Sequence, residues 1–122
     1  MTLTQRTLKL LRDEYRFKLV GKVELFEHNN RTPHGLRRDL FNIFDIVVSD
    51  PAAGIIGVQS CGTDYAAHYR KITEDYKRNA EVWIHSGGRI FLIGWRKVKK
   101  IRGGKQMVYK PRQKEITLED LG

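Results

Sequence analysis

The sequence contains only one cysteine, Cys61, among its 122 residues. A single thiol excludes an intrachain disulfide and is typical of proteins in reducing, intracellular compartments. Long apolar runs are also missing, because no segment approaches the roughly 20 residues needed to span a bilayer. The first residues, MTLTQRTLKLL, lack the apolar core of a signal peptide. We therefore expect a cytoplasmic protein that does not associate with membranes.

Acidic residues are few compared with basic ones. Fourteen Asp and Glu stand against 23 Lys and Arg, which gives a formal net charge of +9. Neutralising phosphates releases condensed counterions, so this excess favours a nucleic-acid partner. The alternative is that the charges only keep a small protein in solution. The length is that of one domain, and we expect residues 1–122 to form it.

Two short apolar segments predict a buried hairpin near the middle of the chain. Residues 43–48 (IFDIVV) and residues 55–58 (IIGV) are rich in β-branched side chains. Between them lies Ser49-Asp50-Pro51, where a proline that cannot donate a ladder hydrogen bond belongs in the turn.

The hairpin carries the first candidate functional residues. Asp45 lies inside the first segment, where an unpaired carboxylate is costly to bury. Gln59 ends the second segment, and Cys61 lies on the same side because side chains alternate with a period of two. The pattern therefore predicts an acid that faces a polar residue on the next strand.

The N-terminal third predicts a helix and a strand. Thr2 and Gln5 fit a capping box, and the apolar spacing that follows indicates a helix over residues 3–15. Alternation then predicts a strand over residues 17–26. Residues 28–36 have the composition of a loop.

The chain beyond the hairpin predicts helices and then two strands. A turn at residues 62–64 begins a helical pattern that restarts near residue 75 and ends at residues 86–88. Residues 89–98 read as a strand covered on both faces, and residues 106–110 as a strand that Pro111 ends. Residues 116–121 fit a short strand or a helical turn. This order predicts an α/β fold with a mixed central β-sheet flanked by helices.

Taken together, the order and spacing of these motifs resemble the PD-(D/E)XK nuclease superfamily, which has a restriction-endonuclease-like core. The resemblance is carried by DLFNIFD at residues 39–45, by GVQSC at residues 57–61 and by GGRIFLIGWRK at residues 87–97. Within the superfamily, the chain is most similar to small phage proteins of the Holliday-junction-resolvase-like and VRR-NUC types. The resemblance implies a metal-dependent endonuclease that acts on duplex or branched DNA. It also implies a homodimer, because two symmetric cuts need two active sites.

The resemblance also implies a site. Asp45, Gln59 and Cys61 fall in the catalytic positions, with Asp45 and Gln59 as ligands of Mg²⁺ or Mn²⁺. A carboxylate suits such a hard cation, and an amide oxygen ligates it without adding charge. Asp39 is either a second ligand, a cap of the loop or a partner of Arg37 or Arg38. Each of Glu14, Glu24 and Glu27 is either the additional N-terminal carboxylate of the site or a surface acid.

Cys61 departs from the family pattern, because it occupies the slot of a lysine. A thiol is a poor ligand for a hard cation and supplies no positive charge. His68, Arg70 and Lys71 on the next predicted helix are alternatives for the missing group. The rival interpretation is a catalytically inactive DNA-binding protein with a nuclease-like fold.

Basic residues gather in three places that predict phosphate contacts, which set affinity more than sequence preference. We expect the first two clusters beside the metal site and the third on a projecting arm. The predicted DNA-binding residues are Arg37, Arg38, Arg70, Lys71, Arg96, Lys97, Lys99, Lys100 and Arg102.

Overall fold

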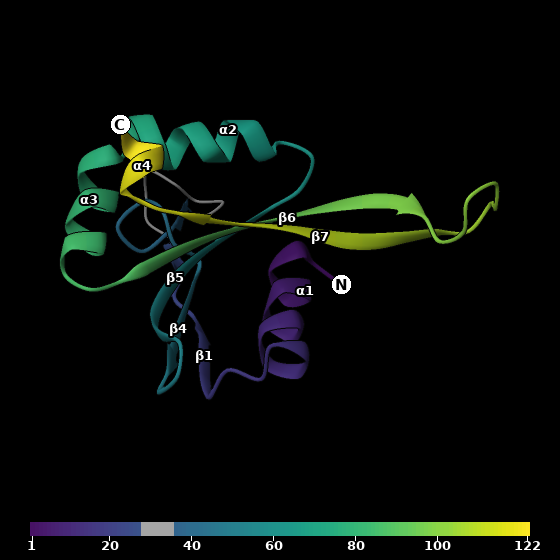
Figure 1. Cartoon of the computed structure of the whole chain (residues 1–122), viewed down its shortest axis with the longest axis horizontal. Helices are drawn as coiled ribbons and strands as arrows, with labels where there is room; N and C mark the ends of the chain where they lie inside the picture. The colour runs from purple at the N-terminus through teal and green to yellow at the C-terminus, as the bar shows by residue number, and fades with distance from the viewer. Residues whose placement is uncertain (28–35) are drawn as a thin grey trace.

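A five-stranded mixed sheet forms the centre of the computed structural model, which describes residues 1–27 and 36–122 (Figure 1). The strand order is β1-β4-β5-β6-β7. β5 and β6 run parallel, and the other neighbouring pairs are antiparallel. The predicted α/β class with a mixed sheet flanked by helices is confirmed. The strands of this sheet are β1 (Leu19–Lys22), β4 (Ile46–Asp50), β5 (Gly54–Cys61), β6 (Arg89–Lys99) and β7 (Met107–Ile116).

Helices cover both faces of the sheet. One face packs against α1 (Leu3–Lys9) and the π-helical turn η1 (Leu10–Glu14) that continues it. The other face packs against the remaining helical segments, which follow β5 or end the chain. These are α2 (Tyr65–Arg70), η2 (Lys71–Asp75), α3 (Lys77–His85) and α4 (Leu118–Leu121).

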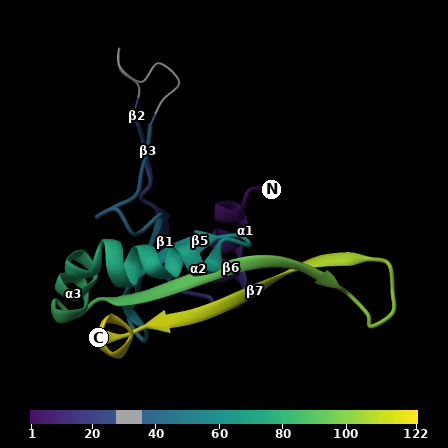
Figure 2. The same cartoon turned by 90° about the horizontal axis from the view of Figure 1, so that it is seen from above.

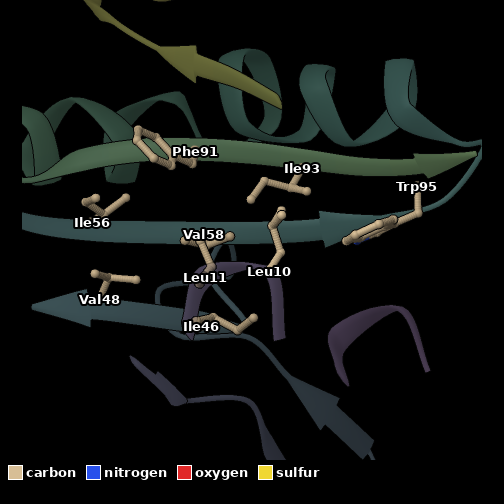
Figure 3. Close-up of a cluster of buried hydrophobic side chains, with 9 residues drawn as sticks. All are labelled: Leu10, Leu11, Ile46, Val48, Ile56, Val58, Phe91, Ile93 and Trp95. Atoms are coloured by element: carbon tan, nitrogen blue, oxygen red, sulfur yellow. The ribbon is translucent and has the colours of Figure 1, made fainter. Parts of the chain in front are cut away.

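The strict alternation of β5 and β6 divides the apolar core into two clusters. On the α1 face, Ile56, Val58 and Ile93 pack with leucines of η1 (Figure 3). On the opposite face, Leu92 and Cys61 pack with residues of η2, α3 and α4. Both central strands are therefore apolar on both sides, as expected for strands covered by helices on each face.

Most of the predicted elements are confirmed. Thr2 and Gln5 form a reciprocal capping box at the start of α1. The central hairpin pairs as expected, with Ile46 opposite Val58, but its first strand begins at Ile46 and not at Ile43, which lies in a turn. α3 ends at His85, and Gly87 follows with a φ of +98°, a conformation that suits glycine. The C-terminal segment is a helical turn and not a strand.

The prediction of one strand over residues 17–26 is wrong. β1 ends at Lys22, opposite Ile46, the first residue of β4, and the Val23 amide makes one more hydrogen bond, to the Asp45 carbonyl oxygen. The chain then turns away into β2 (Leu25–Glu27), which pairs with β3 (Leu36–Arg38) as a separate two-stranded sheet (Figure 2). The expected loop at residues 28–36 lies outside the described residues except for Leu36, which begins β3.

Pro111 does not end the last strand, which corrects a second prediction. β7 continues through this proline, which lies opposite Trp95. β7 is an edge strand, and an edge strand accepts a proline because its missing donor can face away from the neighbouring strand. β7 therefore continues to Ile116, beyond the end that the sequence predicts.

The outer part of the β6–β7 hairpin projects away from the rest of the molecule (Figure 1). We call its residues 96–110 the arm. The prediction of a projecting basic arm is confirmed as a structural feature, because Lys99, Lys100 and Arg102 are all exposed near its tip. In the part of the chain that the structure describes, no helix is long and apolar enough to cross a membrane.

Candidate active site

Asp45 lies at the floor of a cavity of about 720 Å³, where the hairpin meets the helix that follows it. Its side chain is 4% exposed. The Ser60 amide donates to both carboxylate oxygens at 3.2 Å, and Gln59 Nε2 donates to Oδ2 at 3.2 Å. The predicted pairing of an acid with a polar residue on the next strand is therefore confirmed.

Burial raises the pKa of Asp45 from 3.8 to about 7. The hydrogen bond from the Ser60 amide opposes this rise, and the negative charges of Asp39 and Glu24 add to it. Three carboxyl groups thus influence one another at the same site. A cation placed among them would relieve the repulsion and favour the ionised form of Asp45.

Lys71 brings a positive charge to this site from η2. Its ammonium donates to Gln59 Oε1 at 3.2 Å and to Asp39 Oδ2 at 3.1 Å. The side chain is 28% exposed and Asp39 is 17% exposed, so the ion pair is largely shielded from water. Of the alternatives for the missing positive charge, Lys71 is the one that reaches Gln59.

The orientation of the Gln59 amide follows from its two neighbours. The NH₂ group faces the Asp45 carboxylate and the oxygen faces the Lys71 ammonium. The reverse orientation would place the amide oxygen against the Asp45 carboxylate, where both groups are acceptors, and the NH₂ group against the Lys71 ammonium, where both are donors. Gln59 therefore holds Lys71 with its oxygen, whereas the sequence interpretation used that oxygen as a metal ligand beside Asp45.

Cys61 lines the same cavity but has no chemical role that its environment supports. Its thiol is 3% exposed and belongs to the apolar cluster on the α2 face. Burial, with added repulsion from Asp64 and Asp45, raises the pKa of the thiol to about 12. Cys61 therefore stays protonated and acts as a small apolar residue, neither nucleophile nor thiolate ligand.

The ligands for a divalent cation are few. Among residues 1–27 and 36–122, no group of three or more His, Cys, Asp and Glu side chains is placed to hold a metal ion. Asp39 and Asp45 still contribute two carboxylates to one cavity. Mg²⁺ is commonly held by one or two carboxylates together with water and phosphate oxygens, so this donor set fits it.

The predicted basic residues do not all gather at this cavity. Arg38 and Lys71 line it, as predicted. The side chain of Arg37 lies outside the described residues. Arg70, although adjacent to Lys71 in sequence, lines a separate groove with Arg112.

The arm distributes its basic residues over both faces. Arg96 lies on the α2 side, where it shares a small cavity with Tyr65. Lys97 lies on the α1 side, with its ammonium 5.5 Å from the centre of the Tyr109 ring. The guanidinium of Arg6 in α1 stacks on the same ring at 3.9 Å. Adjacent cations of the arm therefore face different surroundings.

Sequence reasoning missed Arg112 and Lys114. The signal was present, since Lys110, Arg112 and Lys114 alternate with a period of two. The expectation that Pro111 ends the strand concealed this pattern.

Comparison of the chain with protein-family models, curated proteins and solved structures found no match.

Proposed function

We propose that the protein is a metal-dependent DNA endonuclease of the PD-(D/E)XK type, with Lys71 in place of the lysine that the strand lacks. The observation that carries this proposal is the contact of Lys71 with Gln59, directly beside the buried Asp45. Carboxylate, amide and ammonium are thus adjacent at the floor of one cavity. The helix–strand hairpin–helix–strand order around them is compatible with a restriction-endonuclease-like core.

Each residue has a part in the proposed reaction. Asp45 and Asp39 would hold Mg²⁺ or Mn²⁺, which when bound polarises the phosphate and acidifies a water molecule. Lys71 stabilises negative charge on the phosphate undergoing cleavage. Gln59 orients the ammonium through its oxygen and the carboxyl group of Asp45 through its amide. Arg38, at the edge of the cavity, contacts the phosphate backbone.

We propose branched as well as duplex DNA as the substrate, with a homodimer supplying the two sites that symmetric cleavage requires. The arm would extend contacts beyond the cavity. Light scattering with and without a four-way junction would measure the assembly. A monomer in both states would remove the dimer from the proposal without affecting the cleavage reaction.

The direct test is incubation of the purified protein with supercoiled plasmid and with a four-way junction, in MgCl₂, in MnCl₂ and in EDTA. We expect nicking that requires the cation and is lost in Asp45→Asn, while the variant still binds DNA. Cleavage that survives in Asp45→Asn would exclude this site. An absence of cleavage with either cation, combined with intact DNA binding, would favour the catalytically inactive DNA-binding protein.

A specific observation favours that rival. The Lys71 ammonium already neutralises Asp39 and satisfies Gln59, so the polar groups of the site are paired within the chain itself. A cation would have to compete with that ammonium for Asp39. Cleavage in MgCl₂ or MnCl₂ but not in EDTA, in the experiment above, distinguishes the nuclease from the inactive DNA-binding protein.

A further inference from the structure

A second basic site lies between α2 and the base of the arm, separate from the Asp45 cavity. Two adjoining depressions of about 220 Å³ and 540 Å³ share Thr63, Tyr65 and Arg112 in their walls. Arg96 lines the smaller one, and Arg70 and Lys114 line the larger one. We call this continuous feature the arginine groove.

Gly94 shapes the floor of the groove. A Cβ atom at this position would come within 2.7 Å of the Tyr65 ring, so the ring packs directly against the strand because no side chain is there. Arg112 lies opposite Gly94 on β7, and its guanidinium stacks on the Tyr65 ring at 4.0 Å. The planar contact fixes the guanidinium and leaves its edge donors available to a ligand.

The three arginines of the groove have no acidic partner among the described residues. Within the described part of the chain, none of Arg70, Arg96 and Arg112 has a carboxylate partner, whereas Lys114 is paired with Asp120 at 3.1 Å. Three guanidinium groups that line one groove give it a positive potential that attracts an anion. Guanidinium groups bind phosphate oxygens in bidentate geometry, which favours phosphate as that anion.

The groove adjoins the candidate active site. Gly62 lines both the smaller depression and the Asp45 cavity, so only the turn that precedes α2 separates them. A polyanion held by Arg96 and Arg112 can pass over this turn to Asp45. A single phosphate ester would leave part of this continuous surface unused, whereas a strand of DNA would occupy it.

We infer that the arginine groove binds the phosphodiester backbone of a DNA strand and directs it to the Asp45 cavity. The inference rests on the proposed function for the identity of the polyanion and goes beyond it in naming the path. It assigns Arg112, Tyr65 and Gly94 to substrate binding, and it separates Arg70 from Lys71 in function. None of these residues contributes to the bond-breaking step.

The test measures binding without cleavage, in Asp45→Asn protein with EDTA, by fluorescence anisotropy at several NaCl concentrations. The groove variant is Arg96→Ala with Arg112→Ala. The matched control, Lys9→Ala with Lys18→Ala, removes two exposed charges from the N-terminal region. Probes are a 20-base-pair duplex and a single strand of the same length.

We expect the groove variant to lower the log–log salt slope for duplex by about 1.8, which is about 0.9 for each lost phosphate contact. This corresponds to roughly 60-fold weaker binding at 0.1 M salt. The control variant should retain the parental slope. A change with the single strand alone would show that one separated strand enters the groove, whereas a change with duplex would show that a paired strand does.

A conservative variant guards against loss of folding. Arg96→Lys with Arg112→Lys keeps both charges, so its salt slope should stay near that of the parent, and thermal melting checks that each variant is folded. Equal slopes for the groove variant and the control would overturn the inference even if the protein cleaves DNA. The opposite result is also informative. If the wild-type protein does not cleave DNA but the groove variant binds DNA more weakly than the control, the arginine groove is a DNA-binding site and the proposed nuclease activity is rejected.

Discussion

The ammonium of Lys71 lies 3.2 Å from the side-chain oxygen of Gln59, and the amide of the same glutamine donates to Asp45. The side chain of Gln59 therefore connects the Asp45 carboxylate to the Lys71 ammonium. Among the described residues, Asp45 is the only buried carboxylate. This link joins a strand, a hairpin partner and a helix into one polar site. It also makes the contribution of each group measurable.

Replacing Lys71 by methionine should lower the rate of DNA cleavage about 100- to 1,000-fold, the usual effect of removing one group that stabilises transition-state charge. DNA affinity should fall by no more than about 8-fold at 0.1 M salt, because at most one phosphate contact is lost. Single-turnover cleavage and anisotropy measure the two quantities separately. Lys77→Met, which removes a cation paired with Glu81 on α3, is the control and should cleave normally. Equal rates for both variants would exclude Lys71 from the reaction.

Stability should depend on pH through Asp45, whose pKa is raised from 3.8 to about 7. Because the folded protein favours the protonated form of Asp45, this group contributes stability that is fully present below pH 3.8, the pKa in the unfolded chain. That contribution is lost as the pH rises through about 7, the pKa in the folded protein. Asp45→Asn does not ionise, so its stability relative to the wild type should increase between pH 4.5 and pH 8, by up to roughly 3 kcal/mol. Urea denaturation at pH 4.5, 6 and 8 measures this difference.

Asp50→Asn is the control for that pH dependence. Backbone hydrogen bonds, led by the one from Lys18, lower the pKa of Asp50, so its contribution is present above its unfolded pKa and lost toward acid. The stability difference between Asp50→Asn and wild type should therefore change only in the acid range. Parallel curves for wild type and Asp45→Asn from pH 4.5 to 8 would show that Asp45 titrates normally.

Gln59→Glu should raise the affinity for Mg²⁺, because it adds a carboxylate beside Asp45 and removes the amide donor. Without the cation, the variant should be less stable at pH 8 than the wild type, since two buried acids then repel each other. Thermal melting with increasing MgCl₂ checks both effects. A melting temperature that does not respond to MgCl₂ would argue against cation binding at Asp45.

Cys61→Lys should destabilise the protein and not restore nuclease chemistry. The thiol is buried at 3% exposure and packs in an apolar cluster, so the longer side chain of lysine would overpack this cluster. The expected loss is about 1 to 3 kcal/mol, whereas Cys61→Ala should cost less. Urea midpoints of the two variants give the comparison. A fully stable Cys61→Lys protein with increased cleavage would show that this position is the lysine slot after all.

The salt dependence of DNA binding should reveal the tip of the arm. Replacing Lys99, Lys100 and Arg102 together by alanine should flatten the log–log slope by up to about 2.7, which is about 0.9 for each phosphate contact. The effect should be similar for unrelated sequences, because phosphate contacts carry no base information. An unchanged slope would mean that these exposed cations only keep the protein in solution.

Local pattern in the sequence determined a large part of this structure. The alternation of residues 45–48 and 55–61 was sufficient to place Asp45, Gln59 and Cys61 on one face of a hairpin, because side-chain direction in a strand depends only on its period of two. The capping box of α1 and the glycine after α3 were likewise predictable, since each involves residues within one turn of the chain.

Only the tertiary structure decided which of these residues meet a partner from elsewhere in the chain. Arg70 and Lys71 are neighbours in sequence, but successive helical residues point about 100° apart, so one lines the arginine groove and the other reaches Gln59. Pro111 is tolerated because β7 occupies the edge of the sheet, a position that the local sequence does not encode. Cys61 is inert because helices cover its face, and burial, unlike alternation, depends on how distant segments pack.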